Sequence, residues 1–161
     1  MRLLNQKFIQ RHSPGPEGID PQRVRFLEKA PRQQYLAMYH EIDLCLDTFP
    51  YNGATTTLDT LWMGVPTIAL RGERGISRSG YSIMQSLGAS ELIARDADEY
   101  VRLNVQLARD VTRRKELRST LRRRLERSPL MDATAFVRDL EAGYRQMWRD
   151  WCRNPDRIID S

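Results

Sequence analysis

The stretch best suited to chemistry is residues 47–66, which read DTFPYNGATTTLDTLWMGVP. An apolar run at 42–46 precedes it, and a proline followed by Asn52-Gly53 favours a tight turn. We therefore predict a strand, a turn and then a helix that begins near Ala54. Because ligands of parallel sheets bind beyond the carboxyl ends of the strands, this turn is a candidate ligand site.

Three threonines open the predicted helix: Thr55, Thr56 and Thr57. Backbone N–H groups at a helix start lack helical partners and lie at the positive end of the helix dipole, so they favour an anion such as a diphosphate. Gly53 lets the backbone approach closely, the hydroxyls can donate to phosphate oxygens, and Asp59 can accept from a ribose hydroxyl. The alternative is an ordinary strand-to-helix connection capped by threonine.

The elements that position this turn alternate between strands and helices along the chain. Strands are predicted at 2–4, 24–26, 42–46, 66–70 and 91–94, and helices at 31–41, 54–63 and 78–87. The pattern is helical from residue 96 onward, with caps or breaks at Asp96, Asp110, Ser128-Pro129 and Asp132. Strands that alternate with helices predict an α/β fold with a parallel sheet covered on both faces.

Further segments match a single family pattern together with residues 47–66. They are Val24-Arg25-Phe26, Ala30-Pro31, Tyr35 to Leu46, Ser77-Arg78, Leu87-Gly88, Glu91 to Ala94, Ser128-Pro129-Leu130 and Met147 to Cys152. In this order and spacing, the chain resembles the nucleotide-sugar half of the O-linked N-acetylglucosamine transferase and Spindly-like proteins, glycosyltransferase family 41.

The resemblance implies a Rossmann-like parallel sheet with helices on both faces, which is the C-terminal half of a GT-B glycosyltransferase and ends in helices. Residues 1–22 would be a truncated strand and irregular connection, 23–152 the nucleotide-sugar-binding domain and 153–161 a tail. With 161 residues, the chain is long enough for one domain and too short for a complete two-domain transferase. We therefore expect this chain to be inactive alone, because the N-terminal catalytic half is absent.

The resemblance also assigns roles to individual residues. Thr55 and Thr56 correspond to residues that contact the donor diphosphate, and Asp59 to a residue associated with the ribose. Arg32 stands where the animal enzymes have a lysine near the uracil. The resulting candidate substrate site is Arg32, Tyr35, Gly53, Ala54, Thr55, Thr56 and Asp59.

Two of these positions depart from the animal enzymes. Ala54 and Tyr35 each stand where those enzymes have a histidine, at the donor phosphate and near the base and ribose respectively. A tyrosine ring can still stack on a base. Because the family contains N-acetylglucosamine and fucose transferases, the donor is either a UDP-sugar or a GDP-sugar.

The resemblance implies inverting transfer to serine or threonine of an acceptor protein, with no cofactor and no metal. The sequence shows no carboxylate cluster with metal-ligand spacing in the donor segment, and the residues proposed as the base belong largely to the N-terminal half. The catalytic residues of this chain are therefore unknown. Expected partners are the donor, the acceptor, and either a chain that carries the N-terminal half or a second copy.

The charge of the chain suggests a rival function. Lysine and arginine number 26 against 21 aspartate and glutamate, a formal net charge of +5, and residues 110–127 alone hold eight basic side chains. A basic helix can bind nucleic acid. However, Leu117, Leu121 and Leu125 recur every four residues in this segment, which predicts a buried stripe with arginines on the solvated faces. We rank the nucleic-acid module below a structural helix.

Three further patterns bear on setting and packing. Cys45 and Cys152 have neither disulfide nor metal spacing, which favours small buried or half-buried side chains in a reducing cytoplasm. No apolar run approaches the roughly 20 residues that span a bilayer. An apolar stripe in the last helix, with Tyr144, Trp148 and Trp151, predicts packing; part of it would face the other half and would leave an exposed patch.

Overall fold

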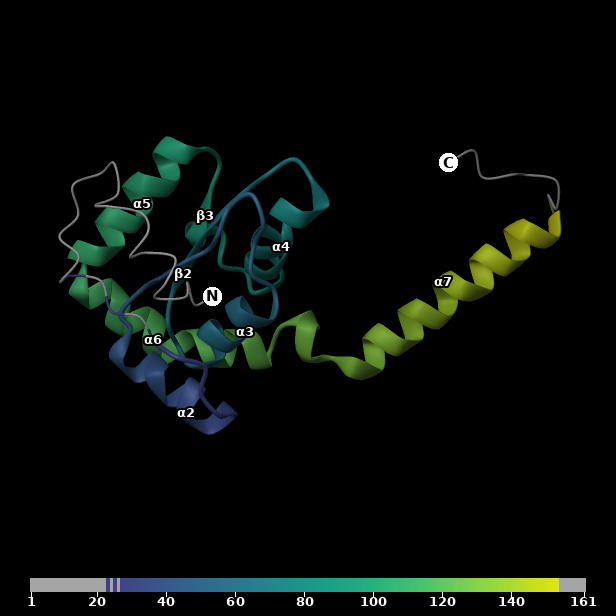
Figure 1. Ribbon diagram of the computed structural model, residues 1–161. Coiled ribbons are helices and arrows are strands. Elements are labelled where there is room, and N and C mark those ends of the chain that lie inside the picture. The colour runs from purple at the N-terminus through teal and green to yellow at the C-terminus, as the bar shows by residue number, and fades with distance from the viewer. Residues whose placement is uncertain (1–22, 24, 26, 154–161) are drawn as a thin grey trace.

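The computed structural model describes residue 23, residue 25 and residues 27–153. The strand predicted at 2–4 lies outside these residues, as do two of the three residues of the strand predicted at 24–26. In the described part, a compact α/β body carries one long C-terminal helix that extends away from it (Figure 1).

The sheet has three parallel strands in the order β1 (Cys45–Leu46), β2 (Thr67–Leu70) and β3 (Ile93–Ala94). Successive side chains of a strand point to opposite faces. Thr67, Ile68 and Ala69 are nevertheless all buried, so both faces of β2 are covered. Helices from three different parts of the chain contact β2, which confirms the predicted parallel sheet with helices on both faces.

Six α-helices accompany the sheet in the described residues. They are α2 (Arg32–Ala37), α3 (Thr55–Trp62), α4 (Ser79–Ser86), α5 (Ala97–Arg109), α6 (Val111–Glu126) and α7 (Ala133–Arg153). Short 3-10 turns lie at Met38–Glu41, Gly75–Ser77, Ser90–Leu92 and Pro129–Met131. The helix predicted at 31–41 is therefore α2 followed by a 3-10 turn, and the strands predicted at 42–46 and 91–94 have only two residues each.

The helix starts predicted from aspartates are confirmed. Each of the three carboxylates accepts a hydrogen bond from the backbone N–H three residues later, at 2.8–2.9 Å. These residues are Asp96, Asp110 and Asp132. Each aspartate satisfies an N–H group that has no helical partner, so the boundaries of α5, α6 and α7 follow from local chemistry.

The predicted leucine stripe of α6 is also confirmed. Leu117, Leu121 and Leu125 are at most 2% exposed and pack in the core of the body. The turn after α3 allows this contact, because Gly64 has a φ of +75° and a Cβ there would lie 2.6 Å from the Arg118 carbonyl oxygen. Only glycine permits both the backbone conformation and the close approach to α6.

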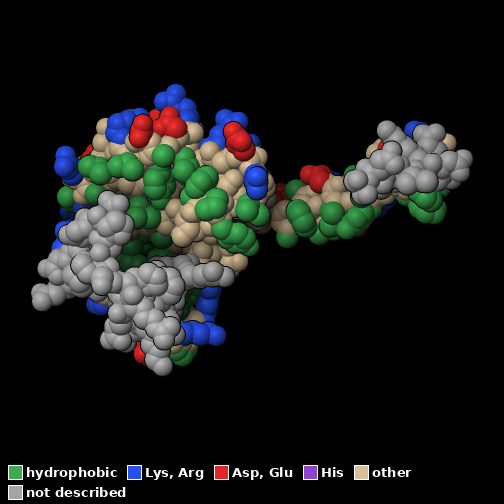
Figure 2. Space-filling view, turned by 45° about the horizontal axis from the view of Figure 1, so that its top comes forward, with side chains coloured by type: hydrophobic (Ala, Val, Ile, Leu, Met, Phe, Trp, Pro, Cys, Tyr) green, Lys and Arg blue, Asp and Glu red, His purple; other side chains and the backbone are tan. Residues whose placement is uncertain are grey.

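The long helix α7 does not pack as its sequence suggests. Seven large apolar side chains on it are between 41% and 67% exposed: Phe136, Val137, Leu140, Tyr144, Met147, Trp148 and Trp151. Figure 2 shows hydrophobic side chains along this projecting helix. The packing predicted for the aromatic cluster is therefore wrong for the described chain, whereas the predicted exposed patch is present.

The two cysteines differ in burial. Cys152, predicted to be buried or half-buried, is exposed, and Cys45 is half-buried as predicted.

Candidate functional site

The turn between β1 and α3 is closed by its own polar groups. Asp47 follows β1 and is only 7% exposed, and its Oδ1 accepts a hydrogen bond of 2.8 Å from the Gly53 N–H. The Asn52 side chain donates to the Thr48 carbonyl oxygen at 2.8 Å. The two ends of the turn are therefore tied together before the helix begins.

Gly53 leaves no free space for a side chain at the end of this turn. A Cβ at this position would lie 2.5 Å from the Thr56 hydroxyl oxygen and 2.8 Å from that of Thr57. Such distances are far below ordinary contact, so a larger residue would require the Thr56 and Thr57 side chains or the turn to shift. The predicted close approach of the backbone at Gly53 is thus present.

The start of α3 has hydrogen-bond donors that no side chain caps. Ala54, which precedes the helix, supplies no side-chain cap. Thr57 is turned inward and donates to the Gly53 carbonyl oxygen at 2.9 Å. Thr55 is exposed and Thr56 half-buried, and neither hydroxyl has a hydrogen-bond partner among the residues that the structure describes. An uncapped helix start with two free hydroxyls is suited to an anion.

One turn further along α3, Asp59 is paired with a residue from α2. Arg32 donates to both carboxylate oxygens, at 2.6 and 2.8 Å, and the Asp59 side chain is only 11% exposed. The pairing satisfies a carboxylate that would be costly to bury alone. Each oxygen keeps a further lone pair, so Asp59 can accept from a ribose hydroxyl while it holds Arg32.

Two tyrosines flank this ion pair. The hydroxyls of Tyr35 and Tyr39 are 2.6 Å apart, and the two rings meet edge to face with centroids 5.3 Å apart. Burial, with the hydrogen bond to Tyr39 second, raises the pKa of the Tyr35 hydroxyl, so it is neutral at physiological pH. The Arg32 guanidinium lies 5.7 Å from the Tyr35 ring centroid, which places a cation and an aromatic ring side by side.

All seven residues of the predicted site therefore lie on the turn before α3, on α3 itself or on α2 where it contacts α3. Two supporting residues were not among those predicted. Asp47 was only the start of the motif, and Tyr100 of α5, whose hydroxyl donates to the Asp47 carbonyl oxygen at 2.8 Å, is 53 residues away. No local pattern indicates such a distant contact.

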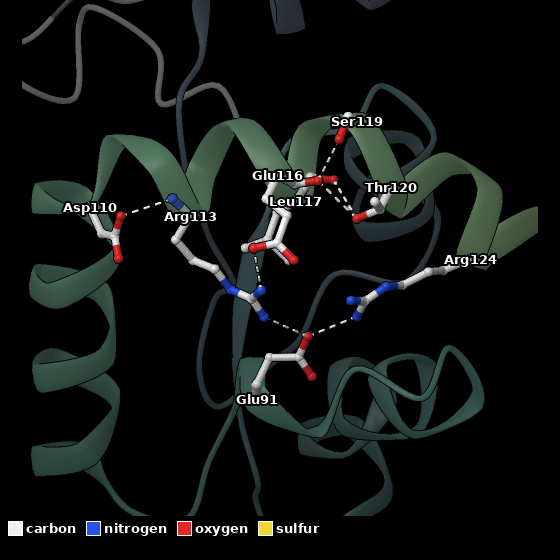
Figure 3. A network of polar contacts seen from close by, with 8 residues as sticks. All are labelled: Glu91, Asp110, Arg113, Glu116, Leu117, Ser119, Thr120 and Arg124. Carbon is white, nitrogen blue, oxygen red and sulfur yellow. Dashed lines mark hydrogen bonds and ion pairs between the residues drawn. The ribbon is translucent and has the colours of Figure 1, made fainter.

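The basic helix α6 has a different arrangement. Glu91 Oε1 accepts from Arg124 at 2.8 Å and from Arg113 at 3.1 Å, and Arg113 also donates to Glu116 at 2.7 Å (Figure 3). Burial raises the pKa of Glu91, but the hydrogen bond from Arg124 and the nearby positive charges outweigh it, and the net effect lowers the pKa.

Other arginines of α6 are bound to the body in the same way. Arg114 donates to the Leu107 carbonyl oxygen at 2.9 Å, and Arg118 donates to that of Ile42. Arg122 lies over the Trp62 ring at 4.2 Å from its centroid. These arginines hold α6 against its neighbours, which favours the predicted structural helix over a nucleic-acid surface.

Among the described residues, no group of three or more His, Cys, Asp and Glu side chains is arranged to hold a metal ion. None of the described helices combines the length and apolar character needed to cross a membrane.

Comparisons with known proteins show a family to which the chain is similar. The family model described as Glycosyl transferase family 41 matches residues 7–140. The probable UDP-N-acetylglucosamine–peptide N-acetylglucosaminyltransferase SPINDLY of Petunia hybrida is 42% identical over 136 residues, which cover 84% of this chain and 15% of that protein. The Caenorhabditis elegans UDP-N-acetylglucosamine–peptide N-acetylglucosaminyltransferase is 33% identical over 132 residues, or 82% of this chain and 12% of that protein.

A solved structure is also similar. A mutant of the Thermobaculum terrenum O-GlcNAc transferase superposes on this chain with a TM-score of 0.79 and 40% sequence identity. The match covers 86% of this chain and 26% of that one. The chain therefore spans well under a third of each of these proteins.

Proposed function

This chain belongs to glycosyltransferase family 41, and we propose that it is the nucleotide-sugar donor-binding domain of a protein O-glycosyltransferase. The observation that carries the proposal is the uncapped start of α3, where the hydroxyls of Thr55 and Thr56 have no partner in the described chain, one turn from the Arg32–Asp59 pair. This combination offers donors for a diphosphate beside an acceptor for a sugar hydroxyl.

In this proposal, each part of the nucleotide has its own contact. The amides and hydroxyls of Thr55 and Thr56 bind the diphosphate, and Asp59 accepts from a ribose hydroxyl. Arg32 and Tyr35 lie where a base would follow, with a cation and a ring face available for stacking. Both UDP-sugars and GDP-sugars fit this description, so the donor is left open between these two classes.

The reaction that such a site serves is transfer with inversion. A serine or threonine hydroxyl of the acceptor protein attacks the anomeric carbon, the bond from that carbon to the diphosphate oxygen breaks, and the hydroxyl proton passes to a base. Negative charge then builds up on the leaving diphosphate, where the start of α3 can stabilise it. The residue that accepts the proton is not among those assigned to this chain.

The 161 residues on their own are proposed to bind a donor without transferring its sugar. Donor and acceptor must be aligned to within about 1 Å, since a misplacement of that size can already cost on the order of 100-fold in rate. This chain covers only 26% of the solved transferase, so most of that framework comes from other residues. A cytoplasmic location and a partner chain that completes the transferase belong to the same proposal.

The second candidate is an inactive nucleotide-binding or protein-interaction domain. The exposed apolar stripe of α7 favours it, because such a surface is suited to contact another protein. Nucleotide binding without transfer, even after addition of a chain that completes the transferase, would support this candidate.

Calorimetric titration tests the donor site directly. UDP, GDP, UDP-N-acetylglucosamine and GDP-fucose are added to the wild type and to the double variant Thr55→Val, Thr56→Val. We expect the variant to lose roughly 1–3 kcal/mol of binding free energy, because valine keeps the shape and removes hydroxyls that bond a charged group. Thr112→Val, at the capped start of α6, is the matched control and should bind like the wild type. Equal binding by the wild type and the double variant would contradict the assignment of Thr55 and Thr56 to the diphosphate.

A radiolabelled transfer assay tests the absence of activity. The purified chain is incubated with UDP-N-acetylglucosamine or GDP-fucose and peptides from a cell lysate, and we expect no labelled peptide. Robust transfer that Asp59→Ala abolishes would show that this chain contains the catalytic machinery itself.

A further inference from the structure

Asp47 is a buried acidic residue that the proposed donor contacts do not use. It follows β1 at the carboxyl edge of the sheet and is bound at two points. Its Oδ1 accepts from the Gly53 N–H at 2.8 Å, and its main-chain oxygen accepts from the Tyr100 hydroxyl at 2.8 Å. Asp47 thus joins the end of β1 to the turn before α3 and to α5.

The other carboxylate oxygen of Asp47 faces the first turn of α4. A Cβ at Gly80 would lie 2.2 Å from Asp47 Oδ2 and 3.0 Å from the Ala69 side chain, so α4 can approach this closely only because residue 80 is glycine. Oδ2 itself is buried and has no hydrogen-bond partner in the described part of the chain. The carboxyl group is therefore enclosed between the turn at Gly53 and α4.

This arrangement costs free energy. Burial raises the pKa of Asp47, although the backbone N–H groups of Gly53 and Thr48 partly offset the effect. Among the described residues, the titratable groups that interact with it are Cys45 and Tyr100, which are neutral at physiological pH and supply no positive charge. An apolar residue would avoid the cost, so the carboxyl group is expected to have a role that depends on its hydrogen bond.

We propose that Asp47 is a positioning residue for the donor site: its carboxyl group holds the Gly53 amide, and through it the start of α3, in the conformation that receives a diphosphate. The inference rests on the proposed function. Gly53 carries the effect, because the Thr57 hydroxyl donates to its carbonyl oxygen at 2.9 Å and a Cβ on it would lie 2.5 Å from the Thr56 hydroxyl oxygen, so Gly53 is in close contact with the first turn of α3.

Three variants separate this role from a merely structural one. Asp47→Asn keeps an oxygen that can accept from Gly53, whereas Asp47→Ala removes it. Asp43→Ala is the control, since Asp43 lies on the same approach to β1 with its side chain 83% exposed. We expect Asp47→Ala to weaken UDP or GDP binding about tenfold or more, and Asp47→Asn to restore it to within about threefold, since one charge-assisted hydrogen bond is at stake. Asp43→Ala should bind like the wild type.

The Gly53 amide resonance gives a second readout that needs no nucleotide. In the free wild type, its proton shift should follow the titration of Asp47 as the pH is lowered, and it should move upfield in Asp47→Ala if that variant folds. If the wild type binds neither UDP nor GDP, the proposed function fails, and the amide still reports whether Asp47 holds the turn. A Gly53 amide that does not respond to pH, or equal nucleotide affinity in folded Asp47→Ala and wild type, would overturn the inference.

Discussion

The helices α3 and α6 both have sequences that suggest anion binding, and they differ in what the fold leaves free. The sequence of α6 is rich in arginine, yet Asp110 caps its start. In addition, the side chains of Arg113, Arg114 and Arg124 are hydrogen-bonded within the body. The sequence of α3 has no basic residue, yet its start has no side-chain cap, and two of its hydroxyls have no partner among the described residues. Suitability for an anion thus depends on donors that the fold leaves unpaired, and the net charge of a segment does not indicate which donors these are.

The largest effect should come from the buried stripe that makes α6 a structural helix. Leu121 is fully buried, so Leu121→Ala should lower the free energy of unfolding by roughly 2–5 kcal/mol, through lost burial and the cavity left behind. Arg123→Ala, on the exposed face of the same helix, should change it by less than about 0.5 kcal/mol. Urea denaturation of both variants measures the difference, and similar values for the two would contradict the structural role of the stripe.

The next effect concerns the conformation of the α3 start. Gly53→Ala places a Cβ against the hydroxyls of Thr56 and Thr57, which should cost roughly 1–3 kcal/mol in strain and weaken nucleotide binding. The control is Gly75→Ala, since a Cβ at Gly75 meets nothing within 4 Å. Thermal unfolding and calorimetric titration of both variants check the prediction. Undiminished nucleotide affinity in Gly53→Ala would show that the turn does not shape the site.

A smaller effect should come from the ion pairs that bind α6 to the body. The pKa of Glu91 is lowered from its ordinary value of 4.5, so its contribution is present above that value and is lost as the pH falls through the lowered pKa. Because these side chains are partly exposed, Glu91→Gln should cost only about 0.2–1 kcal/mol at pH 7.

Urea denaturation of Glu91→Gln and the wild type at pH 7 and pH 3 measures that contribution. The difference should shrink at the lower pH and in high salt, where the charges are neutralised or screened. A difference that stays constant between the two pH values would mean that charge pairing at Glu91 does not stabilise the fold.

The smallest effect is expected where the rival function predicts the largest one. If α6 is structural, replacing Arg122 and Arg123 by alanine should leave the retention of DNA or RNA in a gel-shift series unchanged and weak at physiological salt. Tight binding that falls steeply with salt, and that is lost in this double variant, would instead identify α6 as a nucleic-acid surface. In that case α6 would bind anions rather than serve only as a structural helix.

Much of the fold could be predicted because its signals are local. Asp96, Asp110 and Asp132 cap helices through bonds that reach only three residues along the chain. The stripe of α6 recurs every four residues, a spacing that holds in any amphipathic helix. The three strands of the described sheet were predicted in the right places but too long, because their ends depend on pairing with neighbours and not on their own residues. Residue 25, the described residue of the strand predicted at 24–26, lies in no strand.

The long-range contacts of the site could not be predicted in this way. The candidate site residues were proposed from a family resemblance and from the chemistry of a helix start. Nothing in the sequence indicated that Arg32 binds both oxygens of Asp59, or that Tyr100 donates to Asp47. These partners are 27 and 53 residues apart, and only the packing of α2 and α5 around β1 and α3 brings them together.

The sequence by itself thus determined the family, the order of the elements, the helix caps and the residues of the candidate donor site, because each of these depends on local pattern or on similarity. Only the tertiary structure decided which polar groups are left free. It pairs arginines of α6, leaves the hydroxyls of Thr55 and Thr56 unpaired in the described chain, and exposes the apolar stripe of α7. The physical reason is that hydrogen bonds and burial are settled between residues far apart in the chain, whereas composition and periodicity describe each segment alone.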